Sequence, residues 1–281
     1  MIEQRIDSKE TVKIGRISYI NVAPVYYGLD RQIKPSWLDM VTAPPAVLNT
    51  MLERGEIVMS PVSSAAYAKN HDQWLLMPDV SISSFGNVMS VILASRYPMD
   101  QLHGKRVLFT EESATAAALV RYFFAIRNIQ PVIDTRKIID VETIPHDVDA
   151  ALVIGDTALT QNWPGCYPYV FDLGELWHSL TGLPFVFAVW AIRKDFVNAY
   201  PETVEALKSL FRQSKCMGEE KIDEIVQNAS LKTGLMKDVC RDYFRHLDCG
   251  FGPLHKQGLT RFFNGLHSFG LIREKVILQS A

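Results

Sequence analysis

Short runs of β-branched and aliphatic residues alternate with helix-forming runs along most of the chain, and this alternation limits the possible folds more than any other feature. Pro24 and Pro45 stand where helices are expected to begin, and Gly55 stands where one is expected to end. Strands are expected at residues 12–17, 38–41, 57–59, 75–80, 88–95, 106–109, 138–143, 150–154, 169–171 and 185–192. Strands that alternate with helices predict an α/β protein built in layers.

The expected elements form two α/β units, residues 12–95 and 105–185, and the chain after Asp195 is expected to be helical. Two apolar strands, near residues 90–95 and 186–192, connect the units. Two lobes joined by two crossing strands are the plan of a type II periplasmic-binding-protein fold, which closes around its ligand by hinge motion. The alternative is one continuous doubly wound sheet.

The two-lobed interpretation divides the chain discontinuously. We expect a first lobe of residues 1–94 and 189–281, which includes the helical tail, and a second lobe of residues 95–188. The helices of the tail are expected to have boundaries near Gly218, Gly234, Gly250 and Gly270, since glycine commonly ends a helix.

The charge balance excludes several classes of partner. The formal net charge is -2, from 29 basic and 31 acidic residues without a run of Lys or Arg, so we expect neither a nucleic-acid nor a membrane-surface partner. The amino-terminal residues are polar, and the longest apolar stretch, residues 183–192, is too short to span a bilayer. These features favour a cytoplasmic protein.

The four cysteines form no CxxC pair and the histidines show no HxxxH spacing, which argues against a metal site.

Small polar residues gather where expected strands meet the following helices. In α/β sheets these strand ends face the ligand crevice, and helix amino termini there present free N–H groups and a positive dipole end. Neutral hydroxyl and amide groups at such positions suit an anion held by hydrogen bonds. The segments are 18–21, 60–64, 81–84, 110–115 and 155–157.

Each of these residues also has a purely structural interpretation. Ser and Thr before a helix are ordinary N-caps, and Asp156 is equally well explained as a cap of its own helix. Asn21 is the sharpest exception, because it stands three residues before Pro24 and not at the cap position. Five clusters at strand ends favour a binding cleft for the set, although no familiar catalytic motif is present.

The same segments resemble the chorismate dehydratases of the futalosine route to menaquinone. The resemblance covers residues 13–195 and is carried by GRISYINVAP (15–24), SPVSSAAYA (60–68), VSISS (80–84), SAT (113–115), IGDTAL (154–159), YPYVFDLGELW (167–177) and TGLPFVFAVW (181–190). After Ser84 that family often has Asp-Gly-Pro-Val-Gly-Ser, whereas this chain has Phe-Gly-Asn-Val-Met-Ser at residues 85–90. Met89 therefore replaces a small residue close to the expected cleft.

The resemblance implies a periplasmic-binding-protein-like fold used as an enzyme, without metal or organic cofactor. The implied reaction converts chorismate to 3-[(1-carboxyvinyl)oxy]benzoate and water, by removal of the C3 proton and loss of the C4 hydroxyl. We expect Asn21 and Ser84 to act at the reacting atoms. Residues expected to bind substrate are Ser18, Ser63, Ser64, Ser83, Thr110, Ser113, Ala114, Thr115 and Asp156.

Three points stay open at the level of sequence. The base is either Asp156 or the enolpyruvyl carboxylate of the substrate, and the second is preferred because the polar clusters contain no His or Glu suited to the role. The rival functions are a non-catalytic binding protein for small anions and the sister enzyme of the same pathway that forms a dihydroxynaphthoate. A homodimer is compatible with the sequence but not indicated by it.

Overall fold

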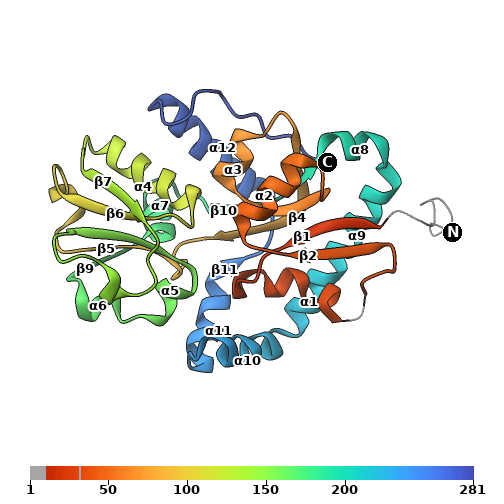
Figure 1. Ribbon diagram of the computed structural model, residues 1–281, viewed down its shortest axis with the longest axis horizontal. Coiled ribbons are helices and arrows are strands. Elements are labelled where there is room, and N and C mark those ends of the chain that lie inside the picture. Colours follow the sequence, from red (N-terminus) through yellow and green to blue (C-terminus); the bar gives the residue numbers. More distant parts are fainter. Residues whose placement is uncertain (1–10, 32) are drawn as a thin grey trace.

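Two separate β-sheets lie side by side along the long axis of the molecule (Figure 1). The computed structural model describes residues 11–31 and 33–281. The alternative of one continuous sheet is wrong, and the two-lobed α/β fold with a largely helical carboxyl-terminal region is confirmed. The expected boundaries at residues 94 and 188 stay a prediction, and each falls within a strand of one of the sheets.

The first sheet contains strands from both ends of the described chain. Its order is β11-β4-β10-β3-β1-β2, in which β1 pairs in parallel with β2 and β3, while β10 runs antiparallel to β3 and β4. The strands are β1 (Val12–Arg16), β2 (Leu38–Thr42), β3 (Met59–Ser63), β4 (Trp74–Ser84), β10 (Phe185–Arg193) and β11 (Leu247–Asp248).

The second sheet repeats this arrangement with residues from the middle of the chain. Its order is β7-β6-β8-β5-β9, and β5 is antiparallel to both of its neighbours, as β10 is in the first sheet. The strands are β5 (Val91–Ser95), β6 (Arg106–Thr110), β7 (Val132–Arg136), β8 (Ala150–Ile154) and β9 (Tyr169–Asp172). The chain thus crosses between the sheets twice, after β4 and before β10.

Helices cover both sheets, and four of them, α3, α5, α7 and α8, begin at the residue after a strand ends. The α-helices are α1 (Ala23–Arg31), α2 (Pro45–Arg54), α3 (Ser64–Lys69), α4 (Ala114–Ile126), α5 (Gly155–Thr160), α6 (Trp163–Cys166), α7 (Leu173–Thr181), α8 (Lys194–Ala199), α9 (Pro201–Glu220), α10 (Ile222–Thr233), α11 (Lys237–His246) and α12 (Pro253–Ser268), with 3-10 turns η1 (Ile20–Val22), η2 (Met99–Gln101) and η3 (Val141–Thr143). None of the helices in the described part of the chain is both long and apolar enough to cross a membrane.

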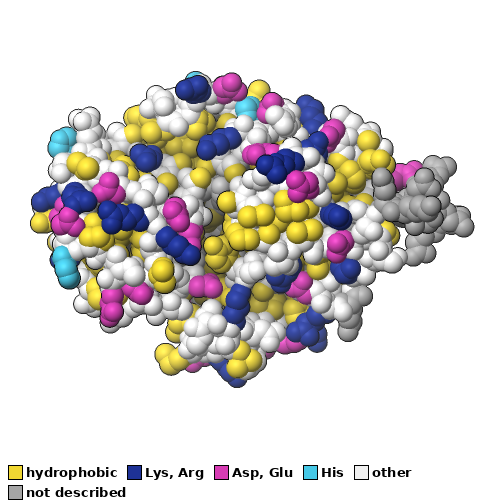
Figure 2. Space-filling model, viewed as in Figure 1, with side chains coloured by type: hydrophobic (Ala, Val, Ile, Leu, Met, Phe, Trp, Pro, Cys, Tyr) yellow, Lys and Arg dark blue, Asp and Glu magenta, His cyan; other side chains and the backbone are white. Residues whose placement is uncertain are grey.

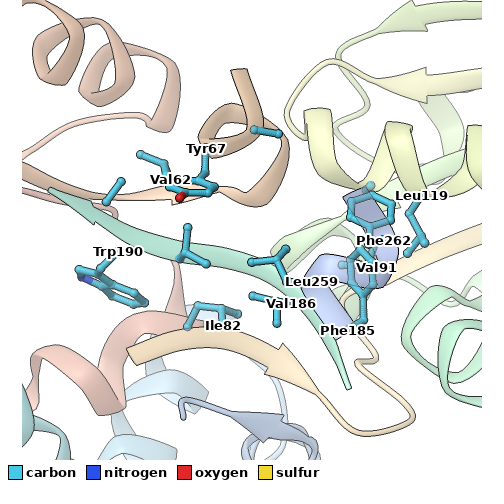
Figure 3. Close-up of a cluster of buried hydrophobic side chains, with 14 of the residues drawn as sticks. Val62, Tyr67, Ile82, Val91, Leu119, Phe185, Val186, Trp190, Leu259 and Phe262 are labelled. Carbon is cyan, nitrogen blue, oxygen red and sulfur yellow. The ribbon is translucent and has the colours of Figure 1, made fainter. Parts of the chain in front are cut away.

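Helix α12 joins the two lobes into one hydrophobic core. Its Phe262 ring lies 4.9 Å from the Phe185 ring of β10 and 6.5 Å from the Tyr122 ring of α4, which covers the second sheet. Figure 3 shows Phe262 and Leu259 among side chains from both halves of the molecule, which include Val62 and Leu119. The core is therefore continuous across the junction between the sheets.

Several expected elements differ from the structure. The strand expected at 57–59 lies at Met59–Ser63. The strand expected at 138–143 is wrong, because residues 141–143 form η3, and the strand of this region is Val132–Arg136. Residues 81–84, expected to follow the strand at 75–80, continue β4, and residues 88–90, expected in a strand, lie outside β5. Gly218, expected at a helix boundary, lies inside α9, where a Cβ would overlap the main chain at Pro24, so the glycine allows close packing and does not end the helix.

Candidate functional site

The polar strand ends of the two sheets meet between the lobes. The backbone N–H of Ala65, in α3, donates to Oγ1 of Thr115, in α4, over 2.9 Å. A Cβ placed on Gly155, at the start of α5, would lie 3.8 Å from the ring of Tyr19, which precedes η1. These two contacts join the segment after β3 to the segment after β6, and the segment after β1 to the segment after β8, as expected for strand ends that face one crevice.

The helix caps keep a donor available for a ligand. Ser63 Oγ accepts from Ala66 N over 3.2 Å, and Ser113 Oγ accepts from Ala116 N over 3.1 Å. A hydroxyl that accepts as an N-cap still has its own proton to donate. Thr115 accepts through Oγ1 in the same way, and Ala114 supplies an N–H in the first turn of the 13-residue helix α4. The cap and ligand-binding interpretations are therefore compatible at these positions.

Three other hydroxyl groups donate within the protein. Ser64 donates to the carbonyl oxygen of Val186 over 2.6 Å, Ser83 to that of Asp248 over 2.8 Å, and Ser84 to that of Gly86 over 2.9 Å. Each keeps lone pairs that can accept a hydrogen bond. Thr110 accepts from Glu112 N over 3.3 Å, and Ser18 is exposed. A role for Ser83 or Ser84 as a donor to a ligand would require this bond to be released.

Asn21 lies in the turn η1 and has an unsatisfied acceptor. Its Oδ1 is buried and finds no hydrogen-bond partner among the described residues. A buried acceptor without a partner costs about 1–3 kcal/mol. The carboxamide is thus prepared to accept from a ligand hydroxyl, whereas the caps described above are prepared to donate.

Asp156 is a titratable group at this junction, in the first turn of α5. Burial raises the pKa of Asp156 above its ordinary value, and the nearby ammonium of Lys232 partly lowers it. Burial is the largest cause that raises the pKa of Tyr19 and of Tyr243, and the Asp156 carboxylate raises both pKa values further. Tyr243 lies on α11 and donates to Ser90 Oγ over 3.2 Å.

A cavity of about 460 Å³ opens next to this junction, between α1 and α10. Its lining includes Ser18, Tyr19 and Lys232, and the Lys232 ammonium donates to the carbonyl oxygen of Ser18. Figure 2 shows that Lys, Arg, Asp and Glu side chains are interspersed over the face of the molecule that is turned to the viewer. Lys232 is thus a cation close to Asp156, and Glu112 and Asp156 are acidic groups near Tyr19.

Sequence reasoning did not assign a role to Lys232, Tyr243 or Asp172. Lys232 and Tyr243 come from the tail, where no strand end marks a position relative to the cleft. The role of Asp172 as a helix cap could have been predicted, since an Asp directly before a helical run is a typical N-cap. Its carboxylate caps α7 by accepting from Gly174 N over 2.9 Å and from Glu175 N over 3.1 Å.

Comparisons with known proteins find relatives that match most of the chain. A family described as menaquinone biosynthesis matches residues 12–268. The chain is 30% identical over 268 residues to the chorismate dehydratase of Thermus thermophilus, which covers 90% of this chain and 94% of that protein. It is 29% identical over 190 residues to a 1,4-dihydroxy-6-naphtoate synthase of Streptomyces coelicolor, which covers 62% of this chain and 63% of that protein.

Solved structures show the same fold at low sequence identity. A crystal structure of a protein from Archaeoglobus fulgidus superposes with a TM-score of 0.72 at 18% identity, covering 94% of this chain and all 100% of the other. The periplasmic aliphatic sulphonate binding protein of Escherichia coli superposes with a TM-score of 0.65 at 15% identity, covering 98% of this chain and 94% of the other. The periplasmic-binding-protein-like fold is therefore shared with binding proteins.

Proposed function

The chain belongs to the menaquinone biosynthesis family, and we propose that it is a chorismate dehydratase, which converts chorismate to 3-[(1-carboxyvinyl)oxy]benzoate and water. The observation that carries this proposal is the 30% identity to a chorismate dehydratase over 90% of the chain. The neutral donors and the unsatisfied acceptor at the junction of the lobes support it, because the substrate is a dianion with a hydroxyl group.

The reaction suits a site that binds and polarises its substrate. The C3–H of chorismate is conjugated through a ring double bond to the ring carboxylate, so removal of the proton moves charge into that carboxylate. The C4–O bond then breaks, the hydroxyl takes up the proton that left C3 and departs as water, and the ring becomes aromatic. Donors that hold the ring carboxylate stabilise the charge as it develops.

The helix start at Ser113 is proposed to hold one substrate carboxylate. The hydroxyl protons of Ser113 and Thr115 and the first N–H groups of α4 supply neutral donors there, and the helix dipole favours an anion. Ser63, Ser64, Ser83, Thr110 and Ser18 are proposed to complete the binding site. Asn21 and Ser84 are proposed to contact the C3–C4 edge, where the Asn21 Oδ1 would accept from the C4 hydroxyl.

The proton at C3 is proposed to move to the enolpyruvyl carboxylate of the substrate, with Asp156 as the alternative base. We expect the Asp156→Asn variant to keep kcat within about tenfold of wild type, because it retains the hydrogen-bonding shape and loses only the carboxylate as a base. Steady-state kinetics with chorismate would measure this. A variant that binds chorismate normally but shows no turnover would contradict substrate-assisted proton transfer and assign the base to Asp156.

The function itself has a direct test. We expect the protein, incubated with chorismate alone, to produce a compound with a benzoate ultraviolet spectrum and the mass of chorismate less one water. A ligand-induced rise in melting temperature without product would favour a non-catalytic binding protein. No response to chorismate at all would favour the sister enzyme, which is supported by a match over 62% of the chain.

A further inference from the structure

The crossover loop, residues 85–90, connects β4 to β5 between the lobes and is held by one carboxylate. Asp172 Oδ2 accepts from Met89 N over 2.6 Å and from Val88 N over 3.0 Å. Its Oδ1 accepts from Val88 N over 3.1 Å and from the two N–H groups of α7. Four backbone N–H groups of two segments thus converge on a single side chain.

The conformation of the crossover loop requires such a restraint. Met89 has a φ of 62°, in the left-handed region that costs a residue with a Cβ atom about 1–2 kcal/mol. The related dehydratases often have glycine at this position, as noted above, and glycine would adopt this φ without strain. In this chain the 2.6 Å bond from Met89 N to Asp172 offsets the strain.

The crossover loop in turn orients groups on three other segments. The carbonyl oxygen of Gly86 accepts from the Ser84 hydroxyl over 2.9 Å. The carbonyl oxygen of Ser90 accepts from the N–H of Gly155 over 2.7 Å, at the residue before Asp156. Ser90 Oγ accepts from Tyr243. A displacement of the loop would therefore move Ser84 and the start of α5 together.

We propose that Asp172 is a positioning residue, which holds the crossover loop in its strained conformation and through it fixes Ser84 and the start of α5 for catalysis. The proposal rests on the proposed function, in which Ser84 contacts substrate. It goes beyond that function because Asp172 itself has no contact with the reacting atoms and acts through the loop.

The Asp172→Asn substitution separates this role from helix capping. An amide has one acceptor oxygen, and with that oxygen turned to Gly174 and Glu175 it still caps α7, as asparagine does well. Its NH₂ group then faces the N–H groups of Val88 and Met89, donor against donor, so the crossover loop is released.

We expect the Asp172→Asn variant to lose kcat by on the order of 10- to 100-fold with a small change in KM, since misplaced groups slow the chemistry more than binding. Hydrogen exchange followed by mass spectrometry is expected to show faster exchange in residues 85–90 and unchanged exchange in α7.

The matched control is Asp149→Asn, because Asp149 accepts from Arg106 N over 2.9 Å at the opposite end of the second sheet's strands. The control is expected to leave kcat and loop exchange unchanged.

The Met89→Gly background gives the second arm of the test. With the strain removed, the loop depends less on the carboxylate, so Asp172→Asn is expected to cost less in kcat when added to Met89→Gly than when added to wild type. An equal cost in both backgrounds, unchanged loop exchange in Asp172→Asn, or faster loop exchange with unchanged kcat would each overturn the proposal. A wild-type protein inactive on chorismate would count against the proposed function, whereas the exchange data would still decide whether Asp172 holds the loop.

Discussion

The Asn21→Ala variant is expected to lose kcat for chorismate dehydration by about 10²- to 10³-fold, the range seen when one well-placed polar group is removed from an active site. The physical reason is the buried Oδ1 of Asn21, which has no partner in the described residues and is proposed to hold the C4 hydroxyl as it leaves. Alanine would remove this contact and the substrate would lose its orientation at C3–C4. The measurement is kcat at saturating chorismate, followed by the appearance of the benzoate chromophore.

Asn49 provides a matched control for this variant. Its Oδ1 is also buried without a partner, but it lies within α2 and outside every polar strand end discussed above. We expect Asn49→Ala to change stability by an amount similar to Asn21→Ala and to leave kcat close to wild type. Wild-type kcat in Asn21→Ala would remove Asn21 from the mechanism.

The Gly258→Ala variant is expected to lower the free energy of unfolding by about 3 kcal/mol, at the upper end of the range for overpacking a core. A Cβ at Gly258 would overlap the carbonyl oxygen of Pro184, at the point where α12 meets the start of β10. That oxygen also accepts from Trp177 Nε1 over 3.2 Å, so moving it would weaken a buried hydrogen bond.

Urea unfolding followed by tryptophan fluorescence would measure the Gly258 effect. Asn264→Ala is the control, because it makes an alanine substitution on the exposed side of the same helix and is expected to change stability by less than about 0.5 kcal/mol. Equal stability of Gly258→Ala and wild type would show that α12 can shift away from Pro184 at little cost.

The sequence predicted elements well where the signal is local. The strand at 106–110 has an apolar run, and Ser113 marks the start of α4 as an N-cap. The strand at 132–136 lacked this signal, because it lies at the sheet edge and is largely exposed. Residues 81–84 were misplaced for another reason: Ser81 and Ser83 donate to carbonyl groups of Gly250 and Asp248, which are distant in sequence.

In the candidate site, too, local signals were predicted and contacts between distant segments were not. Strand-end reasoning expected the segments after β1, β3, β6 and β8 near one another, and the structure shows contacts between pairs of them; Ser63 and Ser113, assigned to substrate binding, cap α3 and α4. It could not show that Ser84 donates to Gly86, because that bond depends on how the chain crosses between sheets. Lys232 was missed since only tertiary packing of α10 places it beside Ser18.

The shared core around α12 has a consequence for affinity. When a ligand draws two independent bodies together, part of its binding free energy is lost to restricting their relative motion. Here Phe262 packs against Phe185 on one side and Tyr122 on the other, so folding already removes much of that freedom. Part of the entropy cost of closure thus falls on folding, which leaves a larger share of each hydrogen bond to the ligand available as binding energy.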